Sequence, residues 1–184
     1  MNHLKTTSSR SVGSIWIWIG ALLTLTVGPG ASAEVTVGDQ PDFELTDLDG
    51  ESVTLSEHRG DVVIVDIWAT WCDPCRQSMP FYRRLYDERS DDGLVILAIS
   101  VDENQTAVAD FRREHRLPFS VLVDNDHKTA DAFSPPGMPT SYLIDADGVV
   151  RYRHVGFRQN DADKLERYVD RLLDESNEHE ETDR

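Results

Sequence analysis

Two long apolar runs dominate the hydrophobic pattern of this 184-residue chain, one over residues 61–68 and the other over residues 94–101. Apolar runs without polar alternation are typical of central strands whose two faces are both covered. Between the runs, a helix over about residues 74–90 is predicted by apolar side chains at helical spacing: Met79, Tyr82, Leu85 and Tyr86. Because a helical crossover favours parallel pairing, these segments form a predicted β-α-β unit.

Shorter patterns on both sides extend this unit to a mixed α/β order. Before it, two alternating segments flank the turn sequence Asp47–Gly50, which predicts a hairpin over residues 42–55. After it, an extra crossover is expected from helix 104–116, strand 119–123 and helix 127–133. The last predicted elements are an antiparallel strand pair and a helix, over residues 140–144, 149–155 and about 161–173. We therefore predict an α/β fold with a central mixed sheet flanked by helices, an N-terminal hairpin and an inserted crossover unit.

The first 33 residues have the pattern of an export segment. Lys5 and Arg10 precede a short apolar stretch over residues 12–27, and Ala31–Ala33 fits a signal-peptidase site. If the segment is not cleaved, residues 12–27 would instead anchor the protein in a membrane. Either outcome places the rest of the chain outside the cytoplasm, in the periplasm or cell envelope. The expected organisation is a signal peptide or anchor, one domain and an acidic tail, over residues 1–33, 34–173 and 174–184.

The charge of the chain limits the partners it can have. Its formal net charge is −16, and removing the two basic residues before Glu34 leaves −16 − 2 = −18. A surface this acidic repels phosphate groups, so we expect no nucleic-acid partner. The histidines have no paired spacing with each other or with the cysteines, so no metal site is predicted.

Cys72 and Cys75 are the only cysteines, and they lie between the first apolar run and the predicted helix. Cysteines at positions i and i+3 near a first helical turn lie on one side, where their sulfurs can form a disulfide or open to a dithiol. A structural staple is the alternative, but closing so short a loop removes little entropy from the unfolded chain. The pair therefore indicates a thiol–disulfide oxidoreductase that uses this redox-active disulfide and needs no other cofactor.

Three segments together resemble the thioredoxin superfamily: residues 64–76, which contain the cysteine pair, Gly137–Thr140, and Leu143–Gly148. Within that superfamily the exported TlpA/ResA-like branch is the most similar. The resemblance extends over about residues 37–173, and the crossover inserted between Val101 and Pro139 is a feature of that branch. A C-x-x-C motif alone is weak support, whereas this one has the preceding strand and a downstream Gly-x-Pro-Thr.

The resemblance implies roles for residues around the cysteine pair. Cys72 corresponds to the exposed attacking cysteine, Cys75 to the resolving cysteine, and Pro139 to a cis-proline that faces them. At a helix N-terminus the backbone dipoles favour a thiolate on Cys72, the reactive form. A cis bond would turn the Met138 backbone outward, where an extended client segment could pair with it. Trp71 is expected to line the groove that receives this client.

Two acidic residues bear on proton transfer and redox poise. Asp66 matches the buried acid of thioredoxins, and burial would raise its pKa, so it is a candidate acceptor for the Cys75 proton. The alternative is a strand-end carboxylate that reaches solvent or a backbone donor. The ResA-like branch commonly has an uncharged residue there and a Glu in place of Ser78, so close kinship in client choice is open.

Asp73 and Pro74, between the cysteines, are assigned to redox tuning. A carboxylate about 6 Å away costs the Cys72 thiolate roughly 0.7 kcal/mol, comparable to the dipole gain of about 0.3–1 kcal/mol. Arg76 acts in the opposite direction to Asp73. Because the cost from Asp73 nearly cancels the gain from the helix dipole, the Cys72 thiolate is little stabilised. A less stabilised thiolate favours a reductase over a disulfide-forming oxidase.

The expected function is reduction of disulfides in client proteins, of the kind found in cytochrome c or copper-site maturation. A membrane thiol–electron carrier is the expected reductant, as the resemblance implies. Two alternatives stay open. A thiol peroxidase with antioxidant activity requires Thr-x-x-Cys, and Thr70 is one residue too close to Cys72. A Cu(I) metallochaperone would use Cys72 and Cys75 as soft ligands, with Met138 or a histidine as a further ligand.

Overall fold

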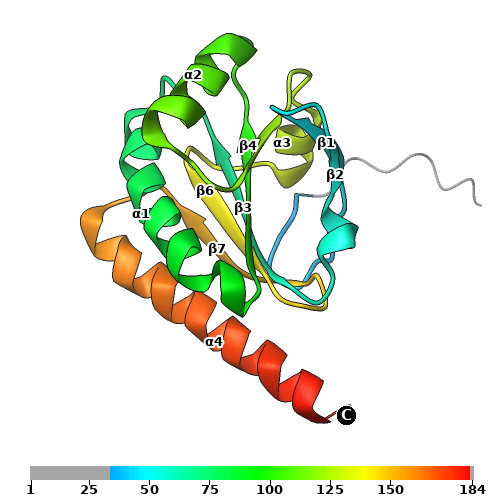
Figure 1. The fold of residues 1–184 in the computed structure, drawn as a ribbon. Coiled ribbons are helices and arrows are strands. Elements are labelled where there is room, and N and C mark those ends of the chain that lie inside the picture. Colours follow the sequence, from blue (N-terminus) through cyan, green and yellow to red (C-terminus); the bar gives the residue numbers. More distant parts are fainter. Residues whose placement is uncertain (1–33, 183–184) are drawn as a thin grey trace, which may run out of the picture. The chain divides into compact units, whose positions relative to one another are not determined.

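The computed structural model describes residues 34–182 (Figure 1). The expected signal peptide or anchor, residues 1–33, lies outside the described residues. Within residues 34–182, no helix combines the length and the apolar character that crossing a membrane requires.

A seven-stranded mixed sheet forms the centre of the described domain, as predicted. Its strand order is β2-β1-β5-β4-β3-β6-β7. The β3–β4 and β4–β5 pairs are parallel, and all other pairs are antiparallel. The N-terminal hairpin joins the sheet because β1 pairs with β5. The strands are β1 (Glu44–Asp47), β2 (Ser52–Thr54), β3 (Val62–Trp68), β4 (Leu94–Ser100), β5 (Ser120–Val123), β6 (Thr140–Ile144) and β7 (Val150–Val155).

Helices cover both faces of the sheet, and a separate apolar cluster lies between the sheet and the helices on each face. One face packs against α1 (Asp73–Arg89), α2 (Gln105–His115) and α4 (Ala162–Thr182), and the other packs against α3 (Lys128–Phe133). Alternation along β3 sends Ile64 and Trp68 to the first face and Val63, Val65 and Ile67 to the second. By the same alternation the side chain of residue 66 lies on the α1 face.

The last helix is longer than the sequence pattern indicated. The prediction ended it at Leu173, whereas α4 continues to Thr182, so most of the acidic tail is helical. Residues 174–182 contain no Gly or Pro that would stop a helix. Tertiary contacts also hold this segment, because Ser176 Oγ donates a hydrogen bond to the Gly60 carbonyl at 3.4 Å.

Candidate active site

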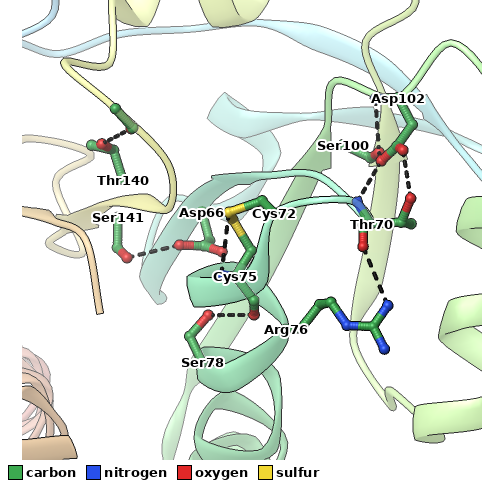
Figure 2. Close-up of a disulfide and its surroundings, with 11 residues drawn as sticks. Asp66, Thr70, Cys72, Cys75, Arg76, Ser78, Ser100, Asp102, Thr140 and Ser141 are labelled. Carbon is green, nitrogen blue, oxygen red and sulfur yellow. Dashed lines mark hydrogen bonds between the residues drawn. A yellow bond between two sulfur atoms is a disulfide. The ribbon is translucent and has the colours of Figure 1, made fainter. Parts of the chain in front are cut away.

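The two cysteines form a disulfide at the N-terminus of α1 (Figure 2). Their sulfurs are 2.11 Å apart and their Cα atoms 5.3 Å apart. Cys72 is the N-cap of α1, and its Sγ accepts a hydrogen bond from the Cys75 amide at 3.3 Å. After reduction, this amide and the helix dipole would stabilise negative charge on the Cys72 sulfur.

Cys72 is less exposed than the sequence analysis expected. Its relative exposure is 8%, because the capping position turns its side chain over the first turn of the helix. Cys72 is still the more exposed of the two cysteines, as predicted, since Cys75 is fully buried. Around them, Asp73 and Pro74 are exposed, and Trp71 has 66% of its surface open to solvent, which places an aromatic ring at the rim of the site.

Asp66 is fully buried in the middle of β3. The alternative of a strand-end carboxylate in contact with solvent is therefore wrong. Ser141 Oγ donates a hydrogen bond to Asp66 Oδ1 at 2.8 Å, while Oδ2 has no partner among the described residues. Burial raises the pKa of Asp66 to about 7, and the nearby hydroxyl groups of Ser141 and Tyr82 oppose that rise.

Asp66 and Cys75 lie on facing surfaces. Asp66 is on the side of the sheet that packs against α1, and the buried face of α1 carries Cys75, Met79 and Tyr82 at helical spacing. The Tyr82 hydroxyl is 2.5 Å from Ser141 Oγ, so α1 is tied to the strands at this position. Figure 2 shows the Asp66 side chain extending from β3 towards the first turn of α1. A buried carboxyl group thus extends towards Cys75.

The Met138–Pro139 peptide bond is cis, as the resemblance implied. Pro139 is followed directly by β6, and its carbonyl accepts a hydrogen bond from the Gly156 amide at 2.7 Å. In the part of the chain that the structure describes, the Met138 backbone amide and carbonyl have no hydrogen-bond partner. An open hollow of about 360 Å³ beside this loop is lined by Ile67, Val101, Ala130, Pro135 and Met138, among others. The loop therefore offers free backbone groups next to an apolar surface.

Asp102 and Ser100, which the sequence analysis did not identify, hold the segment before Cys72 through Thr70. The Asp102 carboxylate accepts hydrogen bonds from the Thr70 amide at 2.8 Å, from the Thr70 hydroxyl at 2.6 Å and from Ser100 Oγ at 2.8 Å. Asp102 lies two residues after the end of β4, which runs parallel to β3, so both strands end at the same edge of the sheet. Functional residues often lie beyond the carboxyl ends of parallel strands, and this rule would have identified Asp102 from the sequence.

Ser78 and Arg76 use their polar groups on the local backbone. Ser78 Oγ donates to the Cys75 carbonyl at 2.9 Å, and it is buried. Arg76 donates to the Thr70 carbonyl at 3.5 Å, and its guanidinium lies 5.7 Å from the centre of the Phe111 ring. Both side chains therefore stabilise the segment that carries the cysteines.

Of the candidate soft ligands for copper, the two cysteine sulfurs are bonded to each other in this oxidised form. Among residues 34–182, no three His, Cys, Asp or Glu side chains gather closely enough to hold a metal ion.

Comparisons with known proteins agree with this geometry. Residues 37–153 match the model of the AhpC/TSA family. Over 134 residues the chain is 34% identical to the thiol-disulfide oxidoreductase ResA of Bacillus cereus, which covers 73% of this chain and 76% of the relative.

Solved structures give the same result. A Chlorobium tepidum protein assigned as thiol:disulfide interchange protein DsbE superposes with a TM-score of 0.73 at 36% identity, covering 76% of this chain and 99% of that one. A second thiol:disulfide interchange protein from Chlorobium tepidum, described as a thioredoxin family protein, has a TM-score of 0.67 at 26% identity and covers 77% and 99%. The thioredoxin-like fold prediction is confirmed.

Proposed function

Because this chain belongs to the AhpC/TSA family and is a thiol–disulfide oxidoreductase with a thioredoxin-like fold, we propose that it is an exported reductase of disulfides in client proteins. The observation that carries the proposal is the cysteine pair at the start of α1, facing a buried carboxyl group. The export signal rests on the sequence pattern of residues 1–33.

In the proposed reaction, the Cys72 thiolate attacks one sulfur of a client disulfide. A bond forms between Cys72 and that sulfur, the client disulfide breaks, and the other client sulfur leaves as a thiolate. Cys75 then loses its proton to Asp66 and attacks the Cys72 sulfur. This step releases the second client sulfur and forms the Cys72–Cys75 disulfide seen in the structure. Two electrons have passed from the dithiol to the client.

Client binding is proposed at the loop before β6. An extended client segment would pair with the free backbone groups of Met138, as an added strand does at a sheet edge. The exposed Trp71 ring, next to Cys72 in the sequence, would also contact the client. We propose clients of the cytochrome c or copper-site maturation type and a membrane thiol–electron carrier that returns the enzyme to its dithiol form.

The thiol peroxidase alternative needs a hydroxyl group that orients a peroxide at the attacking cysteine. The Thr70 hydroxyl instead donates to Asp102 at 2.6 Å, which favours the reductase.

Trapping in the native cell envelope tests the proposal. Cys75→Ala cannot complete the second step, so a mixed disulfide should accumulate on Cys72 and identify the client. Cys72→Ala is the matched control and should trap no client. If Cys75→Ala forms no mixed disulfide, or if the wild type consumes peroxide rapidly and leaves protein disulfides intact, the proposed function is wrong.

A further inference from the structure

The two oxygens of the buried Asp66 carboxyl group are not equivalent. Oδ1 accepts a hydrogen bond from Ser141 at 2.8 Å, whereas Oδ2 is buried and has no partner among the described residues. Buried polar atoms nearly always have a partner, so an oxygen without one calls for an explanation. In Figure 2, Ser141 approaches Asp66 from β6 on the side away from the cysteines.

The hydrogen bonds at Oδ1 have a fixed direction. A serine hydroxyl has one hydrogen, and Ser141 gives it to Asp66. The short contact between Tyr82 and Ser141, at 2.5 Å, must then be a donation from the Tyr82 hydroxyl. All three side chains are buried, and Asp66 and Ser141 are directly paired across β3 and β6. The chain from Tyr82 through Ser141 to Oδ1 is therefore held by three elements of the fold.

We propose that Ser141 and Tyr82 are positioning residues for proton transfer: they occupy Oδ1 and leave Oδ2 as the atom that accepts the Cys75 proton. The inference rests on the proposed role of Asp66 as that acceptor. A free carboxyl group rotates easily about its terminal torsion and would take up a proton on either oxygen. With Oδ1 engaged by a directed donor, protonation at Oδ1 would break the bond from Ser141, so the proton goes to Oδ2.

The hydroxyl groups of Ser141 and Tyr82 also stabilise the ionised form of Asp66 in its buried site. Hydrogen bonds to the charged form favour it, and here they oppose the effect of burial on the Asp66 pKa. Other titratable groups face this site. Cys75 and Tyr82 face it from α1. His154 lies opposite Ser141 in the register of β6 and β7, and the His154 Nε2 atom is 3.4 Å from the Asp161 carboxylate. A variant series must therefore separate the Ser141 contact from these neighbours.

Carbon-13 NMR of the Asp66 carboxyl carbon in the oxidised protein makes that separation, because the disulfide removes both thiol titrations. In the wild type, the carboxyl group should titrate near pH 7. Ser141→Ala should raise the midpoint by about 1–2 pH units, the size of one hydrogen bond to a charged group. Ser141→Thr keeps the hydroxyl and should restore the wild-type value.

Tyr82→Phe tests the chain from its far end, and it should raise the midpoint less than Ser141→Ala does. Tyr142→Phe is the matched control. Tyr142 is also buried, but its hydroxyl donates to the Phe133 carbonyl on the other face of the sheet. If Ser141→Ala and Tyr82→Phe leave the midpoint as close to wild type as Tyr142→Phe does, the inference is overturned; either variant alone suffices if the other does not fold.

Kinetics distinguish failure of this inference from failure of the proposed role of Asp66. The rate at which Cys75 resolves a mixed disulfide is measured against pH. Asp66→Asn should remove the limb of the profile near pH 7, and Ser141→Ala should move that limb to higher pH. An unchanged limb in Asp66→Asn contradicts the role of Asp66. A limb lost in Asp66→Asn and unmoved in Ser141→Ala contradicts only the positioning by Ser141.

Discussion

Replacing Asp66 with Asn should stabilise the oxidised protein at neutral and alkaline pH. Folding buries this carboxyl group and raises its pKa from 3.8 to about 7. The shift is about 3 pH units, and each unit corresponds to about 1.36 kcal/mol, so the ionised group destabilises the fold by about 4 kcal/mol. Asn has a similar shape and no charge, so Asp66→Asn avoids this cost.

The sign of the effect follows from proton binding. Between pH 3.8 and about 7, the folded protein keeps the Asp66 proton and the unfolded chain has lost it. Stability therefore falls as pH rises through this window and stays at its reduced value above it. The free energy of unfolding of Asp66→Asn minus that of the wild type should grow by about 3 kcal/mol between pH 5 and pH 9.

Urea unfolding of both oxidised proteins at several pH values measures this difference. Urea carries no charge, so it does not screen the electrostatic interactions of this acidic chain. Subtracting the wild-type curve removes the contribution of the other carboxylates, which both proteins share. A difference that stays constant from pH 5 to pH 9 would show that Asp66 is not a buried group of raised pKa, and the proton-transfer argument would fall with it.

Four further substitutions, one of them a control, test other parts of the site and fold. Trp71→Ala should change the free energy of unfolding by less than about 0.5 kcal/mol, because the ring is exposed, yet lower kcat/KM for a client at least about fivefold if the ring is a client contact. Asp102→Ala leaves the Thr70 donors without their acceptor and should cost about 2–4 kcal/mol in urea unfolding. Gly148→Ala should lower the free energy of unfolding by about 1–2 kcal/mol, because φ is +81° and the Arg59 guanidinium must also move. Gly156→Ala is the control for the backbone part of that cost, because φ is +77° there and the space around it is open.

The sheet and its helices could be predicted because their signals are local. The mostly apolar run of residues 61–68 contains β3 (Val62–Trp68), and the spacing of Met79, Tyr82 and Leu85 is the buried face of α1. The cysteine pair and Pro139 could be found for a related reason, since each lies in a short motif whose residue types are rarely found together by chance. In these cases the residues that indicate the chemistry lie close together in the sequence.

The hydrogen bonds around Asp66 could not be predicted in this way. Tyr82 looked like any apolar residue of a helical face, and Ser141 like an unremarkable polar residue in a strand. Their contact joins residues 59 positions apart, and the bond from Ser141 to Asp66 joins residues 75 positions apart. Such contacts depend on strand register and helix packing, which a single sequence does not contain. The low exposure of Cys72 was missed for the same reason.

Strand register also explains why the proposed client-binding loop and the proposed proton acceptor belong to one structural unit. Thr140 pairs with Ile67 and Ser141 pairs with Asp66, so the residues that follow Pro139 are fixed against β3 one by one. A slip of one residue would turn Ser141 to the opposite face of the sheet and leave Asp66 Oδ1 without its donor. The cis-proline loop and the donor to Asp66 are therefore set by the same short strand, β6, and any substitution that shifts this strand should impair client binding and proton transfer together.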